Sequence, residues 1–226
     1  MPPPMTDLDA RRWGLGPTVA ARLLHASDAD GPVLTPDERD RMAGFGHADR
    51  RRQFALGRTA ARTLVGARLG VAPDAVPLAV AADGAPDVPG LRVSIAHTGH
   101  GPDVAALAAV ASGPVGADLE RVAPRRPDLW TRIVRPDERP LLDALGGPTD
   151  DAQTLLWTLK EAVLKGQRTG FRAGGRSVRL RLDADGAPPD RGLATVTADT
   201  SGAWTVAYGR AGDLWLAVAW ANPSDD

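Results

Sequence analysis

The chain has 226 residues, of which 43% are apolar and 24% charged, with a formal net charge of −1 at pH 7. The apolar content suffices for a packed core, and the near-neutral charge argues against a general nucleic-acid binder. Cysteine is absent, which excludes disulfides, zinc–thiolate sites and cysteine nucleophiles.

No apolar run reaches the roughly 18 residues of a membrane span. Residues 1–9 also lack the basic and apolar regions of a secretory signal. We therefore expect a cytoplasmic protein that has neither nucleic acid nor membrane among its partners.

The first elements are short. We expect residues 1–4 to be disordered and residues 11–25 to hold an opening strand and a turn. Thr35 is a good N-cap, since Pro36 follows at the first helical position and two acids complete the first turn. This pattern predicts a short helix that ends near Met42.

A longer helix is predicted over residues 50–69, where Gly70 ends it. Its apolar stripe recurs at spacings of seven, three and four and comprises Phe54, Ala61, Leu64 and Val65. Arg51, Arg58 and Arg62 recur on another face. This second face is either a solvated basic surface or a site for a phosphate-bearing ligand, since arginine forks match phosphate oxygens.

Alternating residues predict a strand over 91–95, which leads into a loop that carries His97. A loop histidine just past a strand is well placed to meet a ligand, although a lone histidine is often structural. An apolar strand over 103–110, a turn over 111–114 and a strand over 115–120 then predict a hairpin.

Asp118 and Glu120 stand two residues apart in this last strand, so both side chains project from one face. Such a pair repels itself unless a cation or a proton intervenes, and oxygen ligands suit Mg²⁺. The alternative is a solvent-facing edge strand. A third carboxylate would complete the protein's share of an octahedral site, and Glu161 is our candidate.

A strong helix is predicted over residues 155–165. One stripe is apolar, while Trp157, Glu161 and Lys165 share a second face at a spacing of four. Glu161 and Lys165 could form an ordinary surface pair, worth only about 0.3–0.5 kcal/mol. However, Lys160 and Lys165 are the only lysines among 27 basic residues, which favours a role for the compact ammonium group.

The second half of the chain repeats the pattern of the first. Residues 135–138 resemble another helix start, and four short strands are predicted over 178–182, 193–197, 204–208 and 214–220. Residues 213–223 also echo residues 103–114. We therefore expect an α+β fold of two duplicated halves, each a long helix on antiparallel strands, with the site in the cleft between them.

Gly116-Ala117-Asp118-Leu119-Glu120, followed by residues 157–165 (WTLKEAVLK), resembles the two signature motifs of the 4′-phosphopantetheinyl transferases. The length and duplicated layout are similar to the Sfp-type class. The resemblance covers about residues 35–170. It implies one pseudo-dimeric domain with a nucleotide-binding half, residues 1–112, and a metal-binding half, residues 113–226.

The resemblance also implies the reaction: transfer of the phosphopantetheine arm of coenzyme A to a serine of an apo acyl or peptidyl carrier protein, by a monomer. Asp118, Glu120 and Glu161 would hold Mg²⁺ against the pyrophosphate. Glu161 would be the general base, directly or through water, and Lys165 would neutralise the leaving phosphate; Asp118 would complete the catalytic set. The implied coenzyme A contacts are Arg41, Arg52, Arg58, His97, Thr98 and Lys165.

Three positions depart from the family pattern on the nucleotide side. Gln53 stands where arginine is common, Ala85 where lysine or arginine is common, and Ala96 where serine is common. The departures motivate an alternative, a relative that binds coenzyme A or a carrier protein without catalysis. A third hypothesis, an unrelated Mg²⁺-dependent phosphoryl hydrolase, lacks the expected second carboxylate cluster or glycine loop.

The expected carrier-binding surface lies between residues 122 and 145. Its basic and apolar residues are Arg125, Arg126, Trp130, Arg132 and Ile133. The alternative is that Trp130 and Ile133 are ordinary helix-core residues at a spacing of three.

Overall fold

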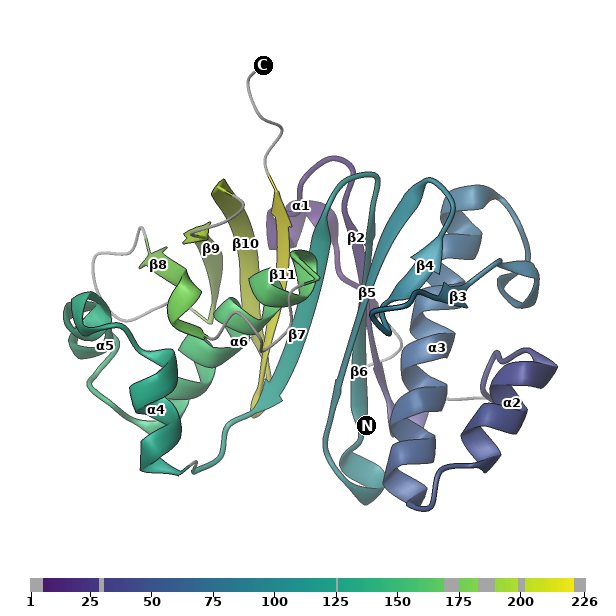
Figure 1. Ribbon diagram of the computed structural model, residues 1–226, viewed down its shortest axis with the longest axis horizontal. Coiled ribbons are helices and arrows are strands. Elements are labelled where there is room, and N and C mark those ends of the chain that lie inside the picture. The colour runs from purple at the N-terminus through teal and green to yellow at the C-terminus, as the bar shows by residue number, and fades with distance from the viewer. Residues whose placement is uncertain are drawn as a thin grey trace.

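The computed structural model describes residues 6–28, 31–124, 126–168, 175–182, 190–198 and 202–221. The expected disordered start at residues 1–4 and the candidate surface residue Arg125 lie outside this part. Two antiparallel sheets stand side by side, each with a long helix packed on it (Figure 1). Within the described residues, no helix is long and apolar enough to cross a membrane.

The first sheet has the strand order β1-β2-β6-β5-β4-β3, and all its pairs are antiparallel. The long helix that covers it is α3 (Ala48–Leu69), preceded by α2 (Pro36–Ala43). The remaining elements are β1 (Thr6–Asp7), α1 (Ala10–Trp13), β2 (Ala20–His25), β3 (Ala79–Val80), β4 (Pro86–Val88), β5 (Leu91–Thr98) and β6 (Ala105–Ala111), with 3-10 turns η1 (Ala26–Asp28), η2 (Pro73–Ala75) and η3 (Gly101–Asp103).

The second sheet has the order β7-β11-β10-β9-β8, again antiparallel throughout. Its long helix is α6 (Asp150–Gly166). The remaining elements are β7 (Val115–Arg121), α4 (Pro127–Ile133), α5 (Arg139–Ala144), β8 (Val178–Leu182), β9 (Arg191–Ala198), β10 (Gly202–Ala211) and β11 (Leu214–Ala221), with 3-10 turns η4 (Pro136–Glu138) and η6 (Gly175–Ser177).

The predicted α+β duplication is confirmed. Each half contributes a strand, then the long helix, then four further strands, and the five equivalent strands occupy the same order in the two sheets. The expectation is refined in one respect, because a strand precedes each long helix. The echoed segments become β6 and β11, each of which pairs on both sides.

The predicted hairpin between residues 103–110 and 115–120 is wrong. β6 pairs with β2 and β5, whereas β7 pairs with β11 in the other sheet. The turn at residues 111–114 therefore carries the chain from one sheet to the other. The acidic strand β7 packs beside β5, and the Ala117 amide donates a hydrogen bond of 2.9 Å to Ser94 Oγ across the boundary.

A glutamate closes each of the two similar helix starts. Thr35 and Glu38 make a reciprocal capping box at the start of α2. At η4 the Arg135 amide donates to Glu138 Oε2 at 2.9 Å, and the Glu138 amide donates to the Arg135 carbonyl at 3.0 Å. Both glutamates are buried. The predicted end of α3 is also confirmed, since Gly70 adopts a left-handed conformation with φ +69°.

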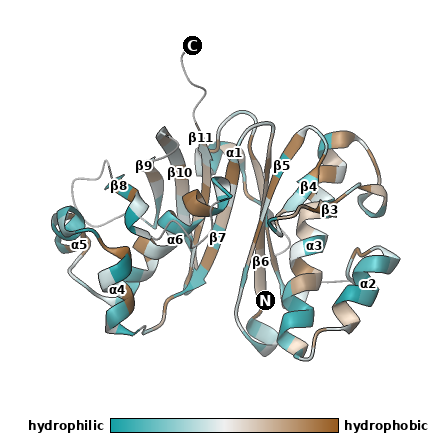
Figure 2. Ribbon diagram, in the orientation of Figure 1, coloured by the Kyte–Doolittle hydropathy of each residue, from teal (hydrophilic) through white to brown (hydrophobic). Residues whose placement is uncertain are grey.

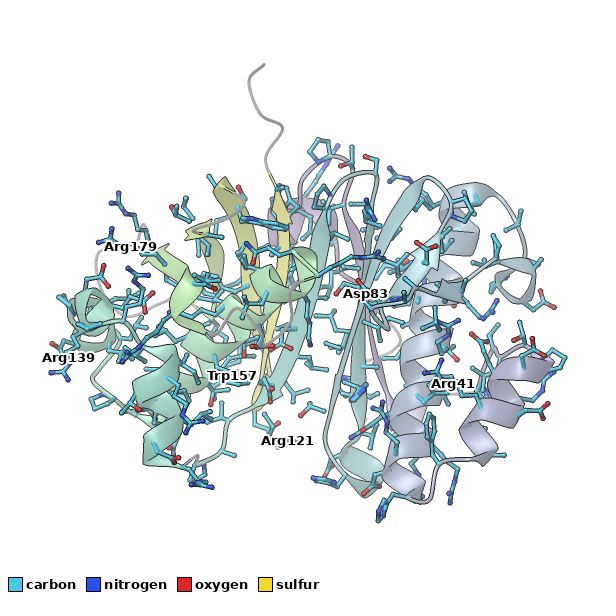
Figure 3. All side chains as sticks on the ribbon, viewed as in Figure 1. Arg41, Asp83, Arg121, Arg139, Trp157 and Arg179 are labelled. Carbon is cyan, nitrogen blue, oxygen red and sulfur yellow. The ribbon has the colours of Figure 1, made fainter. Side chains whose placement is uncertain are left out.

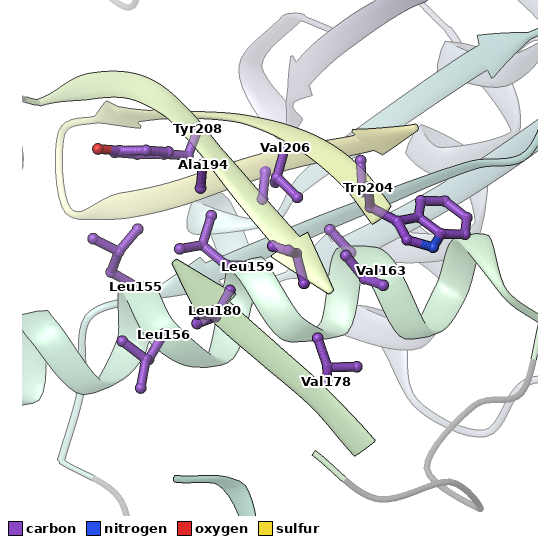
Figure 4. Close-up of a cluster of buried hydrophobic side chains, with 14 of the residues drawn as sticks. Leu155, Leu156, Leu159, Val163, Val178, Leu180, Ala194, Trp204, Val206 and Tyr208 are labelled. Carbon is purple, nitrogen blue, oxygen red and sulfur yellow. The ribbon is translucent and has the colours of Figure 1, made fainter. Parts of the chain in front are cut away.

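Hydrophobic residues concentrate in the central strands, and β6 is buried along its whole length (Figure 2). One core lies between α6 and the second sheet, where Leu159, Val163 and Trp204 meet (Figure 4). A second cluster is shared by the two sheets and contains Leu107 from β6 and Leu119 from β7. The junction between the halves is thus a continuous apolar core that holds β5 against β7.

Candidate functional site

The site begins with an unusually close approach of β7 to α6. A Cβ atom built on Gly116 would lie 1.9 Å from the Ala162 carbonyl oxygen and 2.4 Å from the Gly166 nitrogen. Only glycine therefore allows this packing. The approach places the acidic residues that follow Gly116 against the C-terminal half of α6.

Asp118 faces Lys165 across this contact. Lys165 Nζ donates a hydrogen bond of 2.6 Å to Asp118 Oδ1, so Lys165 does not form the surface pair with Glu161 considered above. Asp118 is buried, and its Oδ2 has no hydrogen-bond partner within the described residues. Burial raises the pKa of the Asp118 carboxyl, and the charge of Lys165 opposes that rise.

The other two carboxylates complete a negatively charged group. Glu120 accepts a hydrogen bond of 3.0 Å from Trp157 Nε1. Glu161 is 7% exposed, and burial together with the neighbouring Asp118 charge raises its pKa to about 7. Burial lowers the pKa of Lys165, but the acidic neighbours outweigh this effect and the net shift is upward.

The donor atoms of these residues are of the type that binds a hard divalent cation. Within the described residues, no group of three or more His, Asp or Glu side chains is placed so that it could hold a metal ion. However, oxygen ligands of this kind suit Mg²⁺, and the orphaned Asp118 Oδ2 has a lone pair that nothing in the described chain satisfies. The raised acid pKa values have the same physical origin, which is like charge in a poorly solvated space.

His97 lies on β5, on the other side of the junction. The expected loop is in fact strand, because β5 continues to Thr98. Arg50 Nη1 lies 2.7 Å from His97 Nε2. Burial, followed by the charges of Arg50 and Lys165, lowers the His97 pKa to about 4. Arg50 is not among the residues expected from the sequence; its spacing of three from Gln53 on one helix face is the signal that points to it.

The expected coenzyme A contacts do not gather as one group. Arg41 is exposed on α2, stacks over Phe54 at 5.7 Å and lines a pocket of about 190 Å³ (Figure 3). Arg52 is exposed and lies 3.3 Å from Asp49. Thr98 ends β5, next to His97.

The arginine face of α3 is not the solvated basic surface considered above. Arg58 and Arg62 are buried rather than solvated, and both pair with Glu38. Arg58 also donates to the Leu78 carbonyl, although its side chain still lines the pocket beside Arg41. Two of the three arginines therefore anchor α2 to α3, and their guanidinium groups are already engaged.

Lys160 has a structural environment. Its side chain is 1% exposed, and Nζ donates to Glu138 at 2.6 Å and to the carbonyls of Ile133 and Gly175 at 2.8 and 3.1 Å. Three acceptors in a closed space explain why a compact ammonium stands here rather than a planar guanidinium. The two lysines of α6 thus have different environments: Lys160 is enclosed by three acceptors, whereas Lys165 meets Asp118 at the site.

The three departures on the nucleotide side have separate environments. Gln53 donates a hydrogen bond of 3.0 Å to the Gly99 carbonyl. Ala96 is buried in the core shared by the sheets. Ala85 lies in the turn between β3 and β4, where its amide donates to Asp83.

The expected carrier surface is divided. Ile133 is buried against Gly175, as the helix-core alternative predicts, whereas Trp130 is half-buried and lines a pocket of about 470 Å³. Arg126 and Arg132 are exposed. The pocket is lined by apolar side chains, by arginines and by the buried amide of Gln153, and its residues include Trp130, Val134, Arg139, Leu142, Gln153 and Arg176.

Comparison with known proteins identifies one family. The sequence model of the 4′-phosphopantetheinyl transferase superfamily matches residues 114–219, which contain the acidic pair, Glu161 and Lys165. A 4′-phosphopantetheinyl transferase of Bacillus subtilis is 31% identical over 172 residues, 68% of this chain and 74% of the relative. A second Bacillus subtilis protein, 4′-phosphopantetheinyl transferase ffp, is 29% identical over 102 residues, 45% of this chain and 44% of the relative. The chain belongs to the 4′-phosphopantetheinyl transferase superfamily.

Proposed function

We propose that this transferase moves the 4′-phosphopantetheine arm of coenzyme A to a serine of an apo acyl or peptidyl carrier protein, in a reaction that requires Mg²⁺. The observation that supports this most directly is the buried acid group with Lys165 beside it. Asp118 has one oxygen on Lys165 and one without a partner in the described chain. That arrangement suits a cation and an anionic substrate together.

Asp118, Glu120 and Glu161 would hold Mg²⁺, which would supply charge stabilisation for pyrophosphate oxygens. Residues of the protein would then transfer the proton and stabilise the leaving group. The serine oxygen attacks the phosphorus that carries pantetheine, the bond to the bridging oxygen breaks, and adenosine 3′,5′-bisphosphate leaves with the electron pair. Glu161 accepts the serine proton, and the Lys165 ammonium faces the charge on the leaving group.

The nucleotide would lie on the side of the first sheet. His97 and Arg50 form a polar pair 2.7 Å apart near Lys165, and the pocket beside Arg41 is lined by residues of α2 and of α3, the helix that carries Arg50. We assign the 3′-phosphate to His97 and Arg50. Arg50 would supply the guanidinium that the family commonly carries at the position of Gln53. Residues 1–112 would thus form the nucleotide half and residues 113–226 the metal half.

The carrier protein would dock on α4. Carrier proteins that are acidic around their serine would meet Arg126 and Arg132, and an apolar side chain could enter the pocket beside Trp130. The protein would act as a monomer in the cytoplasm.

The test is intact-mass analysis of an apo carrier protein incubated with this protein, coenzyme A and Mg²⁺. We expect a mass gain of one phosphopantetheine arm, abolished by EDTA. Glu161→Gln should slow transfer on the order of 100-fold, while the exposed Asp74→Asn control keeps the wild-type rate.

A second measurement separates catalysis from binding. Calorimetry of coenzyme A binding should give similar affinity for the wild type and Glu161→Gln in the absence of Mg²⁺. If several apo carriers stay unmodified while coenzyme A still binds, the proposal fails and a non-catalytic binding relative replaces it.

A further inference from the structure

Arg168 has the one left-handed backbone among the described non-glycine residues. Its φ is +59°, two residues beyond the end of α6. A side chain in this region carries a steric cost, which persists only where the surrounding contacts compensate for it. The contacts of the Arg168 side chain are therefore expected to offset this cost.

The Arg168 side chain crosses from the second half of the molecule to the first. Its Nη2 donates a hydrogen bond of 2.9 Å to the Pro86 carbonyl, at the start of β4. The pairing of β4 with β5 begins only at Asp87, so the Pro86 carbonyl lies beyond that ladder. The residue thus joins the end of α6 to the outer hairpin of the first sheet.

The charges of that hairpin match this contact. Residues 79–88 contain two carboxylates, Asp83 and Asp87, and no basic residue. Both carboxylates lie 3.9 Å from the Arg168 guanidinium. Asp83 lies on the side of the first half that faces the second (Figure 3). One guanidinium therefore faces both carboxylates of the hairpin and offsets part of their negative charge.

The hairpin needs such support. β3 is two residues long and forms the edge of the sheet, and Val80 is exposed. The turn itself is closed by the Ala81 amide on Ala85 and the Gly84 amide on Ala81. A short edge pair is marginal by itself, and a contact from outside the sheet lowers its rate of opening.

We propose that Arg168 is a positioning residue, which fastens the β3–β4 hairpin to the Lys165 end of α6. The Arg168 amide donates to the Lys165 carbonyl at 3.1 Å, so the two residues are one turn apart. Arg168 thereby ties the hairpin to the turn of chain that directly follows Lys165. The link to substrate affinity, unlike the link to the hairpin, rests on the proposed function.

The test uses variants that separate backbone from side chain. Arg168→Gly removes both the strain and the guanidinium, Arg168→Asn tolerates the same backbone without the cation, and Arg168→Lys keeps the cation without the fork. Arg68→Gln, at the exposed end of α3, is the matched control. Hydrogen exchange at the Ala81 and Gly84 amides is the primary readout.

We expect these two amides to exchange about tenfold faster in Arg168→Gly and Arg168→Asn, while amides of β6 and the Arg68→Gln control keep the wild-type rate. In Arg168→Gly and Arg168→Asn, KM for coenzyme A should rise at least about threefold, while kcat stays within about twofold of the wild-type value. In Arg168→Lys the rise in KM should be smaller. Unchanged exchange at both amides would overturn the proposal. If exchange is faster in the variants but the wild type shows no measurable transfer, the positioning role of Arg168 stands and the proposed transferase function is wrong.

Discussion

Two lysines of one helix meet carboxylates in different surroundings. Lys160 is closed in by Glu138 and two carbonyls, whereas Lys165 is one-third exposed and meets Asp118 at the junction of the sheets. Lys160 and Lys165 carry the same ammonium group. Access to solvent decides which lysine can meet a substrate.

Removal of each lysine should therefore give a different loss. Lys160→Met leaves Glu138 buried without its cation and should lower the free energy of unfolding by about 3–5 kcal/mol. Lys165→Met should cost less than half of that, because Lys165 is one-third exposed and the buried Asp118, whose pKa is raised, can take up a proton; the variant should still slow transfer on the order of 100-fold. Urea midpoints and transfer rates of the two variants check this. Equal stability losses would contradict the assignment.

His97 should remain neutral at physiological pH. The folded protein protonates it near pH 4, since burial and the charges of Arg50 and Lys165 oppose the imidazolium, whereas the unfolded chain does so near 6.5. The unfolded state thus binds more protons between these values. The contribution of His97 to the free energy of unfolding is complete above about pH 6.5 and falls as the pH is lowered towards 4.

Two measurements check this expectation. NMR titration of the His97 ring should give a midpoint near pH 4, with the resonance assigned from His97→Gln. The urea midpoint of His97→Gln should fall less than that of the wild type between pH 6.5 and 4. A titration midpoint near 6.5 would show that Arg50 and burial do not act on this ring.

At the scale of elements, the site depends on how closely β7 lies on α6. Gly116 removes the one Cβ atom that would separate them, and Asp118 follows two residues later with its side chain against Lys165. The glycine of the first motif is thus explained by packing. Asp118 and Glu120 of the same motif contribute negative charge at the contact with Lys165.

Gly116→Ala should therefore affect both stability and activity. Its Cβ would meet backbone atoms of α6, so we expect a loss of about 2 kcal/mol or more and slower transfer as β7 moves away. Gly113→Ala is the matched control, because nothing lies within 4 Å of its Cβ position. Chemical unfolding of both variants checks this, and an undisturbed Gly116→Ala would mean that the strand and helix lie further apart.

At the scale of the molecule, the two halves share one core. Leu107 of the first sheet and Leu119 of the second belong to the same buried cluster, which also includes Trp13 and Leu216. Separation of the halves would expose these side chains to water. Burial of each is worth roughly 1.5–3 kcal/mol, so the halves stabilise one another.

Fragments 1–112 and 113–226 should therefore not fold separately. We expect each alone to lack a cooperative urea transition by circular dichroism, and the two together to regain it. Cooperative unfolding of either fragment by itself would show that the shared core is dispensable for that half.

Much of the architecture followed from local patterns. The capped start of α2, the stripe and glycine end of α3, and the strand periods gave the α+β duplication, because these signals depend on neighbours in the chain. Arg58 and Arg62 were misjudged for the opposite reason. Their partner, Glu38, is brought to them by the fold, and a buried arginine is indistinguishable from an exposed one by spacing alone.

The sequence by itself determined the residue types of the acid group, their common strand face and the membership in the family. The tertiary structure decided the rest: that β7 pairs with β11 instead of β6, that Arg50 reaches His97, and that Arg168 reaches Pro86. These contacts join residues 47 to 105 positions apart in the chain. No local propensity encodes them, because they arise only when both cores have packed.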